Sequence, residues 1–158
     1  MTGKQSGAAR RAQIVQAALD LVGEGGVRAV NMGSVARRVG LVPSALYRHF
    51  PGGKADILSS VIDLLESVKF EGTRLAFEEP GPPLTKLRRC FDLHISVIER
   101  YRALPILVLS DSIWIDEPRL KARLVESHQR QQAQIAAIIR EGQESGEIRR
   151  DVDADRIF

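Results

Sequence analysis

The sequence predicts an all-α fold in which a small three-helix head at the N-terminus is joined by one long helix to a larger helical body. Three observations support this prediction. Apolar residues recur at helical spacing along most of the chain, Gly and Pro clusters separate the periodic segments, and positive charge concentrates at the N-terminal end. We therefore expect two domains, residues 1–54 and residues 55–158.

The first two helices of the head are marked by apolar periodicity and by suitable end residues. Apolar side chains from Ile14 to Val22 lie at the three- and four-residue spacing of a helix face, and Gly25-Gly26 ends that segment. Asn31 is a good N-cap for a second short helix, and Gly40 is placed to end it.

A third short helix follows at once. Pro43 suits its first turn, where a missing backbone N–H costs nothing, and Pro51-Gly52-Gly53 ends it. Leu46 and Phe50 are spaced to point into a common core with the two preceding helices. The tight connection between the second and third helices predicts a helix-turn-helix arrangement.

The body begins with a long amphipathic helix from Ile57 to about Phe77. Residues 79–83, Glu-Pro-Gly-Pro-Pro, form a stiff linker, because proline fixes φ and removes hydrogen-bond donors. A further helix carries the apolar residues from Leu84 to Tyr101.

The remaining segments are separated by proline and glycine. Pro105 is expected to interrupt the chain, and the apolar residues 106–115 fit a buried helix better than a strand. A last long helix runs from Pro118 until Gly146 ends it. The tail from Asp153 to the end resembles the start of another helix, and the sequence stops before that helix is complete.

Charge is distributed unevenly between the two predicted domains. Residues 1–54 contain eight Lys and Arg against two acidic residues, a net charge of +6, whereas the remainder contains 15 against 18, a net charge of −3. A basic head favours binding of a polyanion such as nucleic acid, because neutralising phosphates supplies most non-specific affinity. A solvated charged surface is the alternative interpretation.

Composition bounds the class of protein. The single cysteine, Cys90, excludes an intrachain disulfide framework, and no apolar run reaches the length of a membrane span. No nucleophile and base set, phosphate-binding glycine loop or metal-ligand spacing is present. We expect a soluble cytoplasmic protein that is not an enzyme and needs neither metal nor cofactor.

The head resembles the tetracycline-repressor-like (TetR) family of bacterial transcription regulators over residues 11–58. The resemblance lies in RAQIVQAALDLVGEGG for the first helix, MGSVARRVG for the second, and LVPSALYRHF followed by Lys54 and Leu58 for the recognition helix and its exit. It implies a DNA-binding head on a helical domain that binds a small molecule and dimerises. A symmetric dimer would bind a palindromic operator in double-stranded DNA.

Residue chemistry supports a DNA-facing third helix. Small side chains at its start permit close approach to base edges, while hydroxyl, imidazole and guanidinium groups further along can bind phosphates. The resemblance adds positions at the N-termini of the first two helices and after the third. The predicted DNA-binding set is Arg10, Arg11, Asn31, Ser34, Pro43, Ser44, Ala45, Tyr47, Arg48, His49 and Lys54; Arg37 and Arg38 fit a solvated surface equally well.

Two features depart from the family pattern. Many relatives have serine where Val42 stands, and valine cannot accept the N-cap hydrogen bond, a loss of about 1 kcal/mol. Pro43 offsets part of that loss by fixing φ. The Pro-Gly-Gly-Lys exit is one residue longer than the commoner forms, which affects the reach of Lys54.

The resemblance also implies a ligand pocket and a dimer interface in the body. The helix from Pro118 to Ser145 is expected to be one dimer helix, and a second would begin near Asp153. For every pocket candidate, ordinary core packing is the better interpretation of its spacing, and His94 and His128 are each expected to be satisfied core residues. The pocket candidates are Leu65, Phe77, Phe91, His94, Ile98, Tyr101 and Trp114.

The sequence thus predicts a ligand-responsive transcriptional regulator, in the family's commoner mode a repressor, with an unidentified small-molecule effector. Two alternatives stay open. A nucleoid-associated DNA-binding protein of low sequence specificity would use the same head, and a helical enzyme or carrier would use the pocket without DNA.

Overall fold

The computed structural model describes residues 6–156, and every regular element in that range is a helix. Packing divides the chain into two compact units, each built from two separate stretches of sequence. Unit 1 comprises Met1–Leu65 and Tyr101–Lys121, and unit 2 comprises Glu66–Arg100 and Ala122–Phe158. The predicted functional division at residue 54 stays a prediction.

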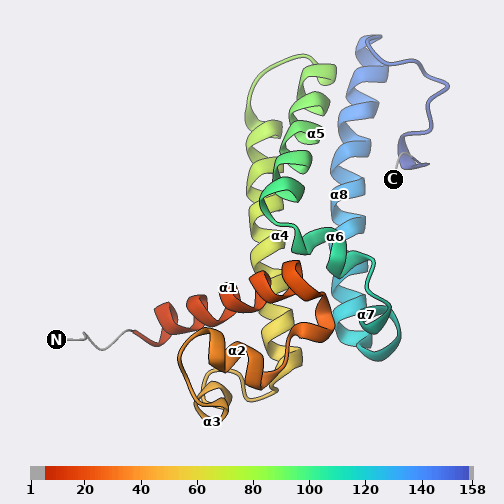
Figure 1. Cartoon of the computed structure of the whole chain (residues 1–158). Helices are drawn as coiled ribbons and strands as arrows, with labels where there is room; N and C mark the ends of the chain where they lie inside the picture. The colour runs from red at the N-terminus through yellow and green to blue at the C-terminus, as the bar shows by residue number, and fades with distance from the viewer. Residues whose placement is uncertain (1–5, 157–158) are drawn as a thin grey trace. The chain divides into compact units, whose positions relative to one another are not determined.

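Unit 1 begins with the head helices; the first two end close to where the sequence pattern predicts, and the third ends before Phe50, which was expected to belong to it. Helix α1 spans Gly7–Gly25, and the N–H of Gly26 donates to the carbonyl of Val22 at its end. A 3-10 turn, η1, spans Val27–Ala29 and leads to α2, Met32–Arg38. Helix α3 spans Pro43–Tyr47, so it is only five residues long (Figure 1).

The turn after α3 depends on the backbone conformation of glycine. Gly53 has φ of 65°, a left-handed conformation that strains other residues, and the N–H of Gly52 donates to the carboxylate of Asp56 at 2.6 Å. Helix α4, Lys54–Glu78, starts immediately afterwards. The predicted break at Pro51-Gly52-Gly53 is therefore confirmed, and it sets the position at which α4 begins.

The core of unit 1 is apolar and fully enclosed. Each head helix contributes side chains with 0% exposure, as does the first part of α4. Helix α6, Ala103–Val108, packs against α1, and α7, Asp111–Asp116, contacts η1. In the core of unit 1, the side chains with 0% exposure are Ile14, Ala18, Val22, Val30, Val35, Leu46, Phe50, Ile57, Leu58, Val61, Leu107 and Ile113.

Of the expectations for residues 101–116, one is wrong and one is confirmed in part. Pro105 does not interrupt the chain; it lies in the first turn of α6, where its missing N–H breaks no helical hydrogen bond. The breaks fall instead at Tyr101–Arg102 and at Leu109–Ser110. The apolar stretch 106–115 is helical rather than a strand, as expected, but it belongs to two short helices and is not buried throughout, since Leu109 and Ile115 are exposed.

Unit 2 contains the rest of α4 together with α5, Pro83–Arg100, the main part of α8, Pro118–Ser145, and the 3-10 turn η2, Ala154–Arg156. Helices α4 and α5 approach closely at Gly72, where an added Cβ would collide with the side chain of Leu93. Ala154 packs with the buried face of α8. Within the described residues the expected final helix is a single 3-10 turn, and residues 157–158 of that prediction lie outside them.

None of the helices in residues 6–156 combines the length and the apolar character that crossing a lipid bilayer would require. The long helices α4 and α8 instead carry polar faces along their length.

The missing N-cap of α3 gives a stability prediction. Val42 has the extended backbone of an N-cap, φ −87° and ψ 148°, but its side chain makes no cap hydrogen bond and is 63% exposed. We expect Val42→Ser to stabilise the protein by about 1 kcal/mol relative to Val42→Ala, because both lose the same exposed methyl groups and only serine gains an acceptor. Urea unfolding measures the difference, and equal midpoints for the two variants would contradict it.

Candidate nucleic-acid interface

Helix α2 is held at its N-terminus by a reciprocal pair of side chains. The Asn31 side-chain oxygen accepts from the N–H of Ser34 at 2.9 Å, and the Ser34 hydroxyl oxygen accepts from the N–H of Asn31 at 3.1 Å. The same hydroxyl donates to the carbonyl of Ala29 at 2.7 Å. The predicted cap at Asn31 is confirmed, and it uses the side-chain oxygen of Asn31. The predicted DNA contacts of Asn31 and Ser34 stay predictions.

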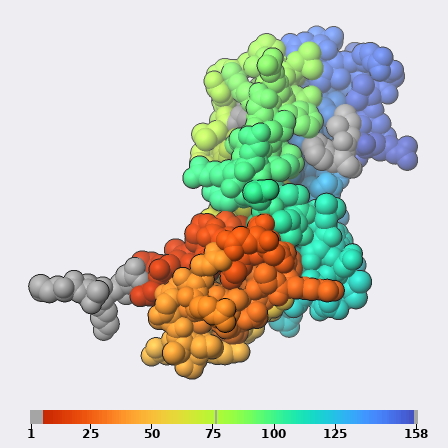
Figure 2. Space-filling view, in the orientation of Figure 1, coloured from red at the N-terminus to blue at the C-terminus, as the bar shows by residue number. Residues whose placement is uncertain are grey.

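Helix α3 has one buried side and one exposed side. Leu46 and Phe50 are 0% exposed, as the sequence analysis expected, whereas Tyr47 is 49% exposed and Arg48 is exposed. Pro43 and Ser44 are also exposed at the start of the helix. In the face drawn in Figure 2, residues of α2 and α3 lie at the surface of unit 1.

Ala45 requires a correction to the predicted outward-facing set. It is only 9% exposed, so its side chain lies on the inner side of α3 together with that of Leu46. His49 is half-buried and lies two residues after the last residue of α3, so its backbone belongs to the turn. The side chains that α3 leaves open to a partner are therefore those of Pro43, Ser44, Tyr47 and Arg48.

Arg11 connects three parts of the head. Its guanidinium donates to the backbone carbonyl of His49 and, at 3.3 Å, to the hydroxyl of Ser60 on α4. It also lies 4.1 Å from the centroid of the Phe50 ring, within the range of a cation–π contact. Arg11 therefore fixes the end of α3 relative to α1 and α4, a role that the sequence pattern did not reveal.

Other cations of the head differ in how far they are already paired. Arg38 makes two hydrogen bonds to Glu24, at 2.9 and 2.6 Å, and these bonds lower the pKa of the Glu24 carboxyl. Arg10 donates to the side chain of Gln13 at 2.7 Å. Arg37 is exposed and forms no hydrogen bond or ion pair with the described residues, and Lys54 is half-buried at the start of α4.

The seven predicted pocket residues are divided between the two units. Leu65, Tyr101 and Trp114 belong to unit 1, whereas Phe77, Phe91, His94 and Ile98 belong to unit 2. Leu65 is buried at 2% exposure, but Phe91 and Trp114 are each 38% exposed. Ordinary core packing therefore describes Leu65 and does not describe the two exposed aromatic residues.

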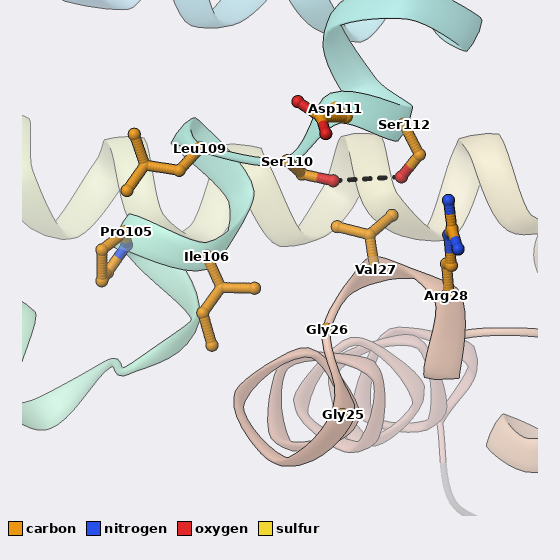
Figure 3. A pocket seen from close by; sticks show the side chains of 10 residues that line it. All are labelled: Gly25, Gly26, Val27, Arg28, Pro105, Ile106, Leu109, Ser110, Asp111 and Ser112. Carbon is orange, nitrogen blue, oxygen red and sulfur yellow. Dashed lines mark hydrogen bonds between the residues drawn. The ribbon is translucent and has the colours of Figure 1, made fainter.

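A groove in unit 1 has a volume of about 490 Å³ and contains none of these candidates. It lies between the α1–η1 corner and the α6–α7 segment (Figure 3). Ile106 and Leu109 contribute apolar surface, Arg28 and Asp111 contribute opposite charges, and the hydroxyls of Ser110 and Ser112 are 3.0 Å apart. Because Arg28 and Asp111 are exposed, water can solvate their charges without a ligand.

A much smaller cavity of about 10 Å³ lies inside unit 2, between α4, α5 and α8. His94 is the one sequence-predicted pocket residue that lines it, and its Nδ1 is buried with no hydrogen-bond partner in the described structure. The expectation that His94 is a satisfied core histidine is therefore wrong. His128, by contrast, is exposed on α8 rather than buried in a core.

Comparison with protein families identifies the head. Residues 14–61 match the family described as bacterial regulatory proteins, tetR family. This segment includes α2, α3 and the beginning of α4, together with most of α1.

Curated relatives extend the similarity along most of the chain. The nucleoid occlusion factor SlmA of Alteromonas mediterranea is 27% identical over 132 residues, covering 84% of this chain and 67% of the relative. SlmA of Aliivibrio fischeri is 28% identical over 134 residues, with the same two coverages.

Solved structures have the same fold. A regulator from Saccharomonospora viridis in complex with choline has a TM-score of 0.81 at 21% identity, covering 95% of this chain and 78% of that one. The TetR-family regulator PfmR of Thermus thermophilus has a TM-score of 0.75 at 29% identity, with coverages of 90% and 76%. The ketosteroid regulator KstR2 of Mycobacterium tuberculosis has a TM-score of 0.79 at 21% identity, with coverages of 97% and 76%.

The contacts of Arg11 give a second prediction. We expect Arg11→Met to lower the free energy of unfolding by about 1–2 kcal/mol, because it removes two charge-assisted hydrogen bonds and a cation–π contact. It should also weaken DNA binding, since the end of α3 is less firmly held. Arg10→Met is the matched control and should change stability by less than about 0.5 kcal/mol, as its only described contact is local. Chemical denaturation of both variants makes the comparison, and an equal loss in the two would exclude the proposed linkage.

Proposed function

Because the chain belongs to the TetR family of bacterial DNA-binding regulators, we propose that it controls transcription by binding a palindromic operator as a homodimer and releasing it when a small molecule binds. The observation that supports this most directly is the two-sided α3, with Leu46 buried in the head and Tyr47 and Arg48 exposed. Repression relieved by the effector is the mode we propose.

In the proposed complex α3 lies in the major groove. The exposed Pro43 and Ser44 at its start are small enough to approach base edges closely, and proline carbon atoms can contact thymine methyl groups. Tyr47 and Arg48 bind phosphates or, for Arg48, the edge of guanine. Lys54 and Arg10 add phosphate contacts from α4 and α1.

Symmetry sets the form of the operator. A dimer related by a two-fold axis presents two identical recognition helices, so its half-sites are inverted copies. Their centres are expected about 34 Å, or one turn of DNA, apart. We propose that residues of α8 take part in the dimer, as the sequence analysis expected, and that the protein acts in the cytoplasm, where the chromosome of a bacterium lies.

Helix α4 provides a physical route from effector to DNA. It begins directly after the turn that holds the end of α3, and its later turns form part of unit 2. An effector that binds one arrangement of α4 better than another shifts the population of DNA-competent dimers. A useful switch needs about 1–3 kcal/mol of coupling between the two sites.

A second function is favoured by the curated relatives. SlmA proteins are named nucleoid occlusion factors and resemble this chain over 84% of its length. A nucleoid-associated role would use the same head and the same phosphate contacts. It differs in specificity, because a transcriptional regulator must prefer its operator to random DNA by about 10³-fold or more.

Selection from a random DNA pool tests the proposed function. We expect an enriched palindrome with half-sites about ten base pairs apart, and binding to it that is about 10³-fold tighter than to random duplex at the same salt concentration. Enrichment of no sequence, with measurable binding to all duplexes, would favour the nucleoid-associated role. Absence of binding to any duplex would reject both.

Arg48 gives a sharper test of the head. We expect Arg48→Ala to weaken operator binding and to reduce the salt dependence of log affinity by about two units, because the homodimer loses one phosphate contact in each subunit. If Arg48 instead reads guanine, specificity is relaxed by about 1–3 kcal/mol at one base pair of each half-site. Arg88→Ala is the control, since Arg88 is 84% exposed on α5 and has one weak described ion pair, 3.8 Å from Asp92. Fluorescence anisotropy at several salt concentrations separates these outcomes, and unchanged binding by Arg48→Ala would contradict the proposed interface.

A further inference from the structure

Unit 2 contains a polar cluster where a helical core would normally be apolar. Three helices supply it: Lys69 and Thr73 from α4, His94 from α5 and Gln131 from α8. The cavity between them has a volume of about 10 Å³, enough for one group the size of a water molecule. Its remaining lining is Cys90, Leu93 and Val97.

Lys69 is a cation without a partner of its own. It is half-buried, and its ammonium makes no hydrogen bond or ion pair with the described residues. Burial lowers the pKa of Lys69, although the negative charge of Glu66 acts in the opposite direction. An ammonium in this environment has lost part of its hydration without gaining an acceptor, which is unfavourable.

Glu66 compensates Lys69 only in part, because one of its carboxylate oxygens faces two other cations. One carboxylate oxygen lies 3.9 Å from Arg123 and 3.6 Å from Arg130, both on α8. The attraction of Glu66 is therefore divided, and Lys69 is left without a counter-ion at ion-pair distance among the described residues.

His94 adds a second unsatisfied group at the same cavity. Its Nδ1 is buried with no partner in the described structure, and burial together with the charge of Lys69 lowers its pKa. Depending on its tautomer, a neutral imidazole can donate or accept through that nitrogen. Thr73 contributes a hydroxyl that donates to the carbonyl of Lys69 at 2.9 Å, and its oxygen can still accept a hydrogen bond.

The cavity differs in this respect from the groove in unit 1. There, the charged groups Arg28 and Asp111 are exposed, so they remain hydrated whether or not a molecule is bound. In unit 2 the polar groups at the cavity are half-buried or buried, His94 Nδ1 fully so, and an incoming group can satisfy them. The unsatisfied polar groups therefore favour ligand binding at the cavity in unit 2, although the groove in unit 1 has the larger volume.

We propose that this cavity binds the carboxylate of a small organic acid, which is the effector of the regulator. A single negative charge balances the one ammonium of Lys69, whereas a dianionic phosphate would leave an excess negative charge in the cavity. In the complex the carboxylate accepts from the Lys69 ammonium and from a protonated nitrogen of His94. The apolar part of the acid packs near Leu93 and Val97. Because the cavity has a volume of only about 10 Å³, it must widen to admit the acid. The proposal rests on the proposed function for its biological role, but binding itself does not.

The chemical probes are hexanoate and its uncharged isostere hexanamide, added to the full chain. The three histidines of the sequence, His49, His94 and His128, give separable imidazole NMR signals, and His94→Gln assigns one of them. We expect hexanoate to shift the His94 signal saturably and to raise the melting temperature, and hexanamide to do neither. An unmoved His94 signal, or an equal response to hexanamide, would overturn the proposal and leave the cavity as a site for a structural water.

Lys69→Met tests the charge directly, since methionine keeps most of the length of the side chain. We expect at least about tenfold weaker hexanoate binding, because a charge-assisted hydrogen bond is lost, while Arg88→Met binds as the parent does. Without hexanoate, Lys69→Met should melt at a higher temperature than the parent, because an unpaired and partly buried cation has been removed. Undiminished hexanoate binding by Lys69→Met would overturn the proposal.

DNA binding is measured in the same samples, so that the two proposals fail separately. Loss of hexanoate binding with intact operator binding in Lys69→Met supports the site. Tight hexanoate binding by a protein that selects no operator would reject the proposed function and retain the carboxylate site. Operator binding by a protein whose His94 signal does not respond to hexanoate would retain the proposed function and reject the carboxylate site.

Discussion

The burial of Leu46 and Phe50 decides which side of α3 is available to DNA. A helix of five residues forms few internal hydrogen bonds and cannot be stable alone. Its geometry is imposed by two large side chains with 0% exposure and by the turn that follows. Everything proposed for the outer side of α3 depends on that anchoring, because the same packing that orients Leu46 inward presents Tyr47 and Arg48 outward.

The head and unit 2 differ in whether their polar side chains have partners. In the head, Asn31 and Ser34 satisfy each other, Arg38 is paired with Glu24, and Arg11 is held by the end of α3. These side chains therefore have partners within the head. In unit 2, buried atoms of Glu66, Arg89 and His94 have no described hydrogen-bond partner. The unsatisfied buried atoms of the described residues thus lie in unit 2, where we propose that the effector binds.

The sequence predicted the head well because its determinants are local. Asn31, Pro43 and the Pro-Gly-Gly turn act within a few residues of where they stand, so helix ends could be derived from them directly. The buried positions Leu46 and Phe50 followed from helical spacing. Ala45 was misjudged because small residues fit either side of a helix, and exposure then depends on neighbours that spacing does not define. Long-range features were not predictable in the same way: nothing near Arg11 indicates that its partners are His49 and Ser60, which are 38 and 49 residues away. The unpaired state of Lys69 and His94 likewise depends on how distant helices meet.

The shortness and missing cap of α3 have an evolutionary consequence. Since neighbouring side chains impose its shape, Ser44 and Arg48 on the outer side contribute little to holding the head together. On the proposed DNA interface, substitutions at these positions would change which DNA sequence is recognised at little cost in folding stability. New target genes could then be acquired through single substitutions on the outer side, while the buried Leu46 and Phe50 support the helix.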